Sequence, residues 1–135
     1  MSEENVEIVR RLFEAFNRQD ASAVAELWRP DGDWRPAFIG GGQLEGAVFR
    51  GPEGMAEFVE VQSETWESVH AEPVKMRDLG DTVLVEVHLS AVGRGSGVPV
   101  DVVGWNVYEV LDGRLASGTA YTSNEKALKA VGLEE

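Results

Sequence analysis

The feature that most constrains the fold is a change in the period of the apolar residues halfway along the chain. In the first half they recur at three- and four-residue spacing, which is typical of helices that bury one face. From Val83 to Thr122 they alternate with polar residues, which is typical of half-buried strands. Helices followed by consecutive antiparallel strands predict an α+β fold in which helices cover one face of a bent sheet.

Two helices are expected at the start of the chain. Ser2 is placed to cap the first, which has a broad apolar face and extends to about Arg18. Asp20 then caps a second, shorter helix, in which Trp28 faces inward and which Pro30 ends.

A third, longer helix is expected to begin at Gly51 and Pro52, because proline at the first helical position lacks only an N–H that would have no partner there. His70 is predicted to lie at its end. Gln62 falls in the middle of its apolar arc, so the amide of Gln62 is expected to be buried. The arc comprises Met55, Phe58, Val59, Trp66 and Val69.

The strands are predicted from alternation and from turn residues between them. Short strands are expected at 33–35 and 48–50, and long strands at 83–91, 98–111 and 114–122. The long strands belong to a meander of three or four. The stretch between Pro36 and Ala47 contains three consecutive glycines and is expected to be a loop.

A short C-terminal helix completes the predicted elements. Thr122 and Glu125 have the spacing of a capping box, and Gly132 is placed to end the helix. The chain has 135 residues, 43% of them hydrophobic, which is enough for a single domain with one core over residues 1–135.

The strand at 98–111 carries an amide among apolar side chains. Asn106 lies in one alternating row with Val102, Gly104, Tyr108 and Val110. If this row faces the core, the amide needs a partner, because burying an unpartnered amide costs about 1–3 kcal/mol.

The hairpin turn at residues 112–113 allows two registers between the last two strands. A two-residue turn would place Asn106 beside Thr119. A type I turn with a glycine bulge would pair Val110 with Arg114, and we favour this register. It predicts small neighbours on one face: Tyr108 beside Ala116, Asn106 beside Gly118, and Gly104 beside Ala120.

Small residues beside an amide on an apolar, concave face leave volume that side chains do not fill, which predicts a pocket. The amide of Gln62, in the third helix, is also expected to be buried and to need a hydrogen-bond partner. The two amides either bond to each other or to water, or they meet a ligand. The predicted pocket residues are Asn106, Gln62, Tyr108, Trp34, Trp66, Phe58, Gly104, Gly118 and Ala120.

The opposite face of the sheet is too apolar for a freely solvated surface. Trp105, Val103, Val107 and His88 lie on it, and we interpret it as the interface of a homodimer. The alternative is that a loop or tail of the same chain packs over it.

Charge and composition exclude several classes of function. The net charge of −12 argues against nucleic-acid and membrane partners. No cysteine is present, the start of the chain lacks the pattern of a signal peptide, and no apolar run is long enough to cross a bilayer, so we expect a cytoplasmic protein. Two isolated histidines, His70 and His88, predict no metal site, and no cofactor motif is found.

Three stretches together resemble the SnoaL-like family of the nuclear transport factor 2-like superfamily. They are LFEAFNRQDASAVAELWRPDGDW, FRGPEGMAEFVE and SGVPVDVVGWNVYEVLDGRLASGTAY, and the likeness covers nearly the whole chain. It implies a cystatin-like cone, in which a strongly curved antiparallel sheet wraps around three helices and encloses an apolar cavity. It also implies dimerisation through the outer face of the sheet, and the superfamily includes polyketide cyclases, ketosteroid isomerases, epoxide hydrolases and dehydratases.

The catalytic residues of these enzymes are not matched. By the resemblance, Asn106 occupies the position of the isomerases' hydrogen-bond-donating acid, Leu12 that of a tyrosine, and Pro36 that of the general base. Ala120 occupies the position of the cyclases' acid/base aspartate. An amide does not take up a proton near neutral pH, so Asn106 is no substitute for a base.

Two functions follow from these patterns. The first is binding of a small, mostly apolar, neutral molecule whose oxygen meets Asn106 or Gln62. The second is an isomerase, cyclase or hydrolase whose base is Asp31, Asp33 or Glu45. An accessory interaction module with a filled cone is a third alternative.

Overall fold

A computed structural model describes residues 2–39, 42–43 and 47–133. The helices within these residues are α1 (Ser2–Asn17), α2 (Ala21–Glu26), α3 (Gly51–Thr65) and α4 (Asn124–Ala130). The strands are β1 (Trp28–Arg35), β2 (Phe38–Ile39), β3 (Gly42–Gln43), β4 (Phe49–Arg50), β5 (Trp66–Asp78), β6 (Thr82–Gly93), β7 (Pro99–Leu111) and β8 (Arg114–Tyr121). The predicted α+β class is confirmed.

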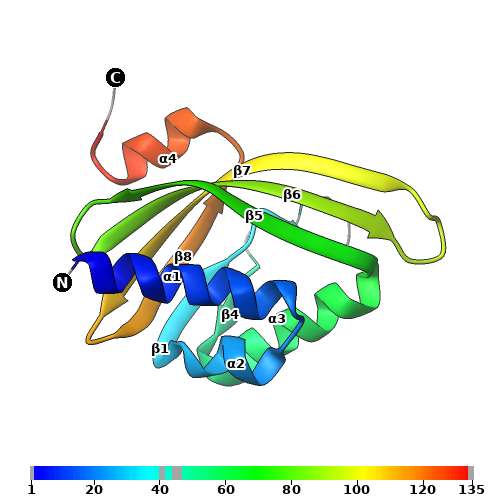
Figure 1. Cartoon of the computed structure of the whole chain (residues 1–135), viewed down its shortest axis with the longest axis horizontal. Coiled ribbons are helices and arrows are strands. Elements are labelled where there is room, and N and C mark those ends of the chain that lie inside the picture. Colours follow the sequence, from blue (N-terminus) through cyan, green and yellow to red (C-terminus); the bar gives the residue numbers. More distant parts are fainter. Residues whose placement is uncertain (1, 40–41, 44–46, 134–135) are drawn as a thin grey trace.

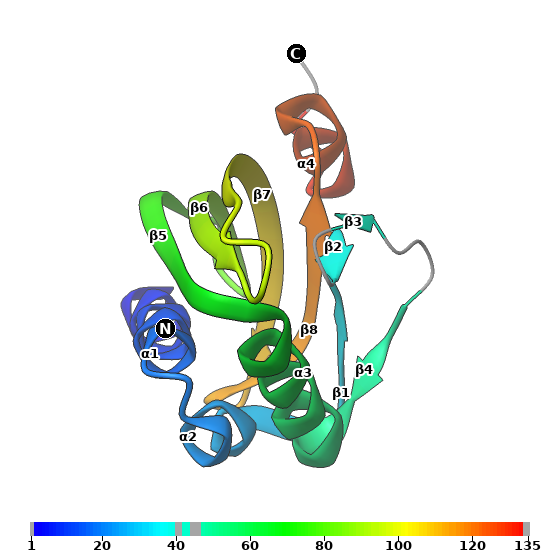
Figure 2. The same ribbon diagram turned by 90° about the vertical axis from the view of Figure 1, so that its right-hand side faces the viewer.

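Six of these strands form one curved sheet in the order β4-β1-β8-β7-β6-β5. The long strands β5 to β8 are an antiparallel meander, and β1 joins β8 in parallel, which the sequence analysis did not anticipate. The sheet bends around α1, α2 and α3, which lie on its concave side, whereas α4 lies on the other side (Figures 1 and 2). This is the predicted cone with its additional C-terminal helix.

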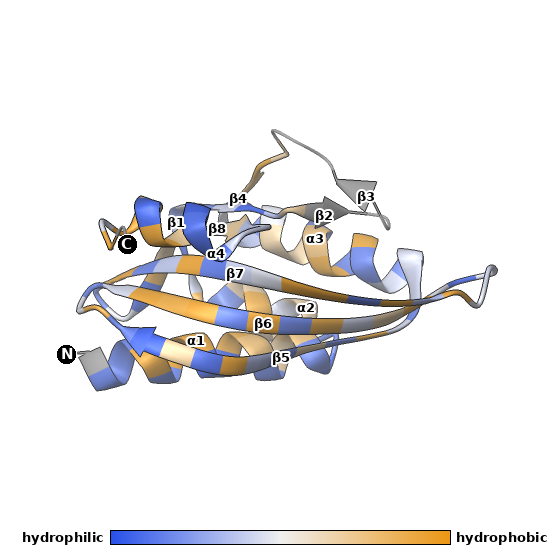
Figure 3. Cartoon of the chain, turned by 90° about the horizontal axis from the view of Figure 1, so that it is seen from above, coloured by the Kyte–Doolittle hydropathy of each residue, from blue (hydrophilic) through white to orange (hydrophobic). Residues whose placement is uncertain are grey.

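The main core lies between the concave face and the three enclosed helices. Val83, Val85 and Val87 point inward from β6 and are buried, and Val9 of α1 is in the same core cluster. Figure 3 shows hydrophobic and hydrophilic residues alternating along β5, β6 and β7. The alternation places one apolar row against the helices and the other row on the convex face.

A second, smaller cluster lies under α4 on the convex face. Ala127 and Leu128 of α4 are buried with Leu84, and Trp105 and Val107 pack against them. The intramolecular alternative therefore accounts for two of the residues that were predicted to form a dimer interface. α4 covers them within the same chain.

The third helix is shorter than predicted. α3 ends at Thr65, and the chain continues as strand β5, which the sequence analysis missed. Trp66, Val69 and His70 therefore lie in a strand instead of a helix. Strand pairing with β6 outweighs the local helical pattern, and Pro73 could not continue a helix because it lacks the N–H.

The second helix also ends early. Asp20 caps it as predicted, since its Oδ1 accepts a hydrogen bond of 3.1 Å from the N–H of Ala23. Trp28 is buried, as predicted, but it begins β1 and is not helical. The carbonyl of Leu27 already accepts a bond from the N–H of Leu115, so pairing with the sheet starts before Pro30 could stop a helix.

The favoured register of the last hairpin was wrong. Asp112 and Gly113 have φ values of 52° and 78°, which form a tight two-residue turn that pairs Leu111 with Arg114. A register shift then follows two residues into β8, so that Ala116 has no partner in β7. The observed neighbours are Val110 with Leu115, Tyr108 with Gly118, and Asn106 with Ala120.

The cap of the last helix is one residue later than predicted. The N-cap is Ser123, whose hydroxyl accepts a bond of 3.1 Å from the N–H of Lys126, so Thr122 and Glu125 do not form a capping box. Gly132 follows the helix with a φ of 77°, the left-handed conformation that glycine adopts without steric cost.

Candidate functional site

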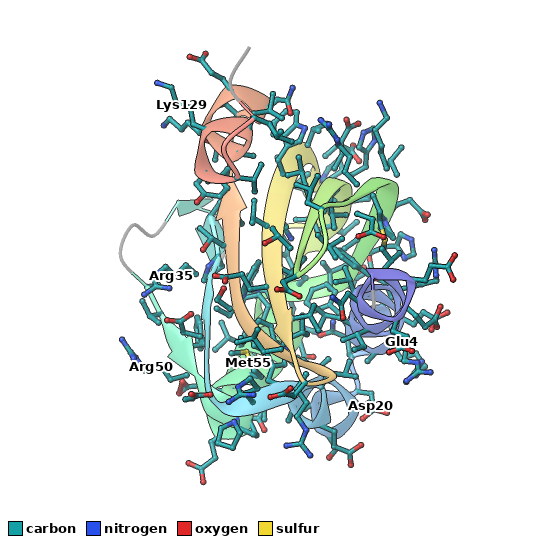
Figure 4. The ribbon with its side chains drawn as sticks, turned by 90° about the vertical axis from the view of Figure 1, so that its left-hand side faces the viewer. Glu4, Asp20, Arg35, Arg50, Met55 and Lys129 are labelled. Carbon is teal, nitrogen blue, oxygen red and sulfur yellow. The ribbon has the colours of Figure 1, made fainter. Side chains whose placement is uncertain are left out.

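A cavity of about 130 Å³ lies between the concave face of the sheet and the helices. Met55 belongs to its wall, and Figure 4 shows this side chain inside the molecule while Arg35 and Arg50 point away. The described residues that line it are Leu12, Phe13, Phe16, Val24, Trp28, Trp34, Pro36, Ala37, Met55, Phe58, Gln62, Ala71, Val87, Leu89, Val102, Gly104, Asn106, Tyr108, Ala120 and Tyr121. Aliphatic and aromatic groups thus form most of the wall.

Gln62 brings an amide to this wall from the middle of α3. The residue is 4% exposed, and its Oε1 accepts a hydrogen bond of 2.9 Å from Nε1 of Trp66. An indole N–H is only a donor, so the amide oxygen must face Trp66. The amide nitrogen, Nε2, is buried without a partner among the described residues.

Asn106 and Tyr108 bring a second polar pair from β7. Nδ2 of Asn106 donates a hydrogen bond of 2.9 Å to the hydroxyl of Tyr108. Burial raises the pKa of Tyr108 well above its ordinary value, and the bond from Asn106 offsets this effect only in part. The hydroxyl therefore stays protonated at physiological pH and is not a base. The two amides, Gln62 and Asn106, do not bond to each other.

The aromatic residues beside the cavity are packed in defined pairs. The rings of Trp34 and Tyr108 are stacked, with centroids 5.9 Å apart and planes at 12°. Phe58 meets Trp34 edge to face at 5.8 Å. Gly118 allows this packing, because a Cβ at that position would lie 2.8 Å from Trp34 and 2.9 Å from Tyr108.

The structure brings most of the predicted pocket residues together. Asn106, Gln62, Tyr108, Trp34, Phe58, Gly104 and Ala120 line the cavity. Trp66 and Gly118 are not part of its wall and act through neighbours: Trp66 fixes the amide of Gln62, and Gly118 accommodates the aromatic stack.

Sequence reasoning missed other residues of the wall, most clearly Trp28, Phe13 and Phe16. Phe13 and Phe16 were recognisable as part of the apolar face of the first helix, but helical periodicity does not separate residues that fill a core from residues that border a cavity. Trp28 was expected to face inward from a helix, whereas it lines the cavity from strand β1.

The charged side chains predicted as bases lie elsewhere. Asp33 forms an ion pair of 2.9 Å with Arg35, and Asp31, with 76% of its side chain exposed, pairs with Arg29 at 3.2 Å. Trp34 and Pro36, which alternate with Asp33 and Arg35 along the chain, line the cavity, in line with the inward direction predicted from alternation. Glu45 lies outside the described residues. None of the described residues that line the cavity is an aspartate, glutamate, histidine, lysine or arginine.

The positions named by the resemblance do border the cavity. Leu12, Pro36, Asn106 and Ala120 all line it. The resemblance therefore led to four positions at the cavity, where the side chains are an aliphatic residue, a proline, an amide and an alanine. Within the part of the chain that the structure describes, no group of three or more His, Cys, Asp or Glu is placed to hold a metal ion.

The convex face carries conventional surface pairs. Nε2 of His88 lies 3.2 Å from a carboxylate oxygen of Glu86, and half of the His88 side chain is exposed. Val103 is 43% exposed. Of the residues predicted to form a dimer interface, these two are exposed, whereas Trp105 and Val107 pack under α4.

A bent sheet wrapped around three helices, with a cavity in the cone, defines the nuclear transport factor 2-like class of fold. Residues 9–118 match the model of the SnoaL-like domain, and the chain belongs to this family. None of the described helices is long and apolar enough to cross a membrane. No curated protein shows a significant sequence match.

Solved structures support the same fold. A protein with a ketosteroid isomerase-like fold from Catenulispora acidiphila DSM 44928, in complex with trimethylamine, has a TM-score of 0.77 and 23% identity, covering 94% of this chain and 93% of that one. An NTF2-like protein of unknown function from Burkholderia pseudomallei K96243 has a TM-score of 0.76 and 16% identity, covering 93% of this chain and 95% of that one. A LEH-like epoxide hydrolase of M. tuberculosis has a TM-score of 0.74 and 17% identity, covering 95% of this chain and 89% of that one.

Proposed function

We propose that this protein binds a small, mostly apolar, neutral molecule in the cavity of the cone. The observation that carries the proposal is the unpartnered amide nitrogen of Gln62, which is buried in a mostly apolar and aromatic wall. A buried donor without a partner costs about 1–3 kcal/mol, and a ligand oxygen or a water molecule would recover that free energy. Ligand sites in proteins commonly combine an apolar wall with a few polar groups.

The size of the cavity suits a compact ligand. An apolar protein cavity of about 150 Å³ binds benzene, and the cavity in this protein is about 130 Å³. A molecule with one ring is therefore the expected scale for the part of the ligand that enters the enclosed space.

The polar groups on the wall support binding without acid/base catalysis. Asn106 and Gln62 are amides, and the hydroxyl of Tyr108 is held protonated by burial, which raises its pKa. A general base must take up a proton near neutral pH, and none of these three groups does. They are suited to orienting a carbonyl or hydroxyl group of a ligand.

A thermal shift screen tests this proposal. A ligand at 100 times its dissociation constant adds about 2.7 kcal/mol to the free energy of unfolding. Compact cyclic ketones, terpene-like and polyketide-like compounds should raise the melting temperature, and Gly104→Leu, which would fill part of the cavity, should remove the response. If no such compound has an effect on the wild-type protein, the proposal is wrong.

A second candidate is an enzyme that uses the same cavity. It is supported by the similarity in fold to an epoxide hydrolase, and it would require a carboxylate that reaches the cavity. Incubation with a compact apolar epoxide, followed by mass spectrometry, separates the two candidates. Recovery of the diol at a rate above the spontaneous rate would support the enzyme, whereas unchanged epoxide with a thermal shift would support binding alone.

We also propose that the protein is a cytoplasmic homodimer. The absence of cysteine supports a reducing compartment, and the exposed Val103 and His88 leave part of the convex face available to a second copy. Light scattering of the wild type and of Val103→Lys tests the dimer: the wild type should have twice the monomer mass, and the variant should dissociate. A monomeric wild type would contradict it.

A further inference from the structure

Three buried N–H donors on the cavity wall share one property. Nε1 of Trp28, Nε1 of Trp34 and Nε2 of Gln62 are all inaccessible and have no hydrogen-bond partner among the described residues. All three residues line the same cavity, and they are 2%, 8% and 4% exposed. Unpartnered buried polar groups are uncommon in folded proteins, so three beside one cavity point to a function.

The fully buried groups without a partner on this wall are all donors. An indole nitrogen has no acceptor capacity, and the acceptor atom of Gln62 already binds Trp66. The hydroxyl of Tyr108 accepts a bond from Asn106, so its own proton remains available to donate. A buried donor without a partner carries a cost in free energy, and a ligand acceptor that reaches it would recover that cost.

We propose that the cavity selects compact apolar ligands that carry an uncharged hydrogen-bond acceptor, such as a ketone, ester or ether oxygen, and that Gln62 and Trp34 supply the selecting donors. This inference rests on the proposed binding function and specifies the chemical class of the ligand. It assigns recognition mainly to the amide of α3 and to an indole of β1, because the amide nitrogen of Asn106 is engaged by Tyr108.

Charged ligands fit this cavity less well than a neutral acceptor does. A carboxylate or phosphate would be buried without a lysine, arginine or histidine on the described wall, which is costly in an apolar site. The aromatic rings would suit an ammonium ion through cation–π contacts. The buried groups without a partner on this wall, however, are N–H donors, which attract an acceptor and repel a cation, so a neutral acceptor fits them better than a cation does.

Three probes of similar size test the proposal: cyclohexanone, its isostere methylenecyclohexane, and tetramethylammonium. Methylenecyclohexane has the shape of the ketone without the acceptor. Dissociation constants for each are measured by NMR titration with the wild type, Gln62→Met, Trp34→Phe and the convex-face control Trp105→Phe. Melting curves identify any variant that does not fold, and the two cavity variants are independent of each other.

The quantity to compare is the ratio of the ketone affinity to the hydrocarbon affinity. We expect this ratio to fall about tenfold in Gln62→Met and in Trp34→Phe, which corresponds to about one hydrogen bond in each case. It should be unchanged in Trp105→Phe. Tetramethylammonium should bind more weakly than cyclohexanone to every form.

The outcomes separate this inference from the function on which it rests. If ketone and hydrocarbon both bind but the ratio is the same in all four proteins, or if tetramethylammonium binds most tightly, the donor-selection inference is wrong and ligand binding stands. If none of the three probes binds the wild type, both the inference and the proposed binding function are wrong.

Discussion

The two faces of strand β7 show how differently one strand can use its alternating residues. On the concave face, Asn106 and Tyr108 border a cavity, and Tyr108 is only 3% exposed. On the convex face, Trp105 packs under α4 and Val103 remains 43% exposed. Each face thus carries one large aromatic residue beside smaller ones.

The difference lies in how the polar groups are satisfied. On the convex face Glu86 faces His88 at 3.2 Å, and the hydroxyl of Ser117 donates a bond of 2.9 Å to Glu109. On the concave side Gln62 and the indoles of Trp28 and Trp34 have unpartnered donors. Hydropathy therefore does not distinguish the two faces, whereas unsatisfied hydrogen-bond donors do.

The largest expected effect contrasts a core leucine with an exposed leucine of the convex face. Leu115 is 0% exposed in the main core, so Leu115→Ala should lower the free energy of unfolding by about 4 kcal/mol, from lost burial and the cavity that remains. Leu111→Ala, at an exposed position in the same row of β7 as Val103, should change it by less than about 0.5 kcal/mol. Urea denaturation measures both, and similar losses for the two variants would contradict the assignment of the faces.

Two glycines of the concave face should behave differently. Gly118→Ala would place a Cβ 2.8 Å from Trp34 and should cost about 1–3 kcal/mol. Gly104→Ala is the matched control, since its Cβ would meet nothing closer than the carbonyl of Tyr121 at 3.6 Å. Thermal denaturation should show a lower melting temperature for the first variant alone. A loss of stability in Gly104→Ala would show that the concave face has less space than described.

Helix α4, which packs over part of the convex face, begins at the side-chain cap of Ser123. Ser123→Ala removes the acceptor for the N–H of Lys126 and should cost about 1 kcal/mol. Thr122→Ala should be nearly neutral, because Thr122 does not cap the helix. Loss of the cap should also raise the solvent exposure of Trp105, which fluorescence quenching by acrylamide detects. Equal effects of the two substitutions would contradict the observed cap.

The smallest effect concerns pH and the concave hydroxyl. Burial raises the pKa of Tyr108 in the folded state, so its contribution to stability is complete below the ordinary tyrosine pKa of about 10 and is lost as the pH rises above that value. Tyr108→Phe should therefore make stability less sensitive to pH above about 10. Urea titrations between neutral and alkaline pH test this, and identical pH profiles for the two proteins would contradict the burial of the hydroxyl.

The sequence was sufficient to predict the cone, the rows of alternating residues and seven of the residues that line the cavity. Asn106 and Gln62 are recognisable because each amide interrupts an apolar pattern at a fixed period. The positions of Leu12, Pro36 and Ala120 on the cavity followed from the family resemblance.

The remaining features depend on long-range pairing that local patterns do not encode. Residues 66–70 extend the helical arc of α3 in sequence, yet they pair with β6 because the sheet offers them hydrogen bonds. The shift at Ala116 is a bulge inside a strand and has no turn residue to mark it. The partners of Gln62 and Asn106 also required coordinates, since sequence does not determine which atom of an amide faces which neighbour.

The most direct test of the concave site is the NMR spectrum of the indole N–H protons during titration with cyclohexanone. The chain has four tryptophans, and two of them, Trp28 and Trp34, have unpartnered N–H groups beside the cavity. We predict that the Trp34 signal and the Gln62 side-chain amide signals move as the ketone binds, while the Trp105 signal under α4 stays in place. A shift of Trp105 alone, or no shift in any of them at saturating ketone, would contradict a ligand site inside the cone.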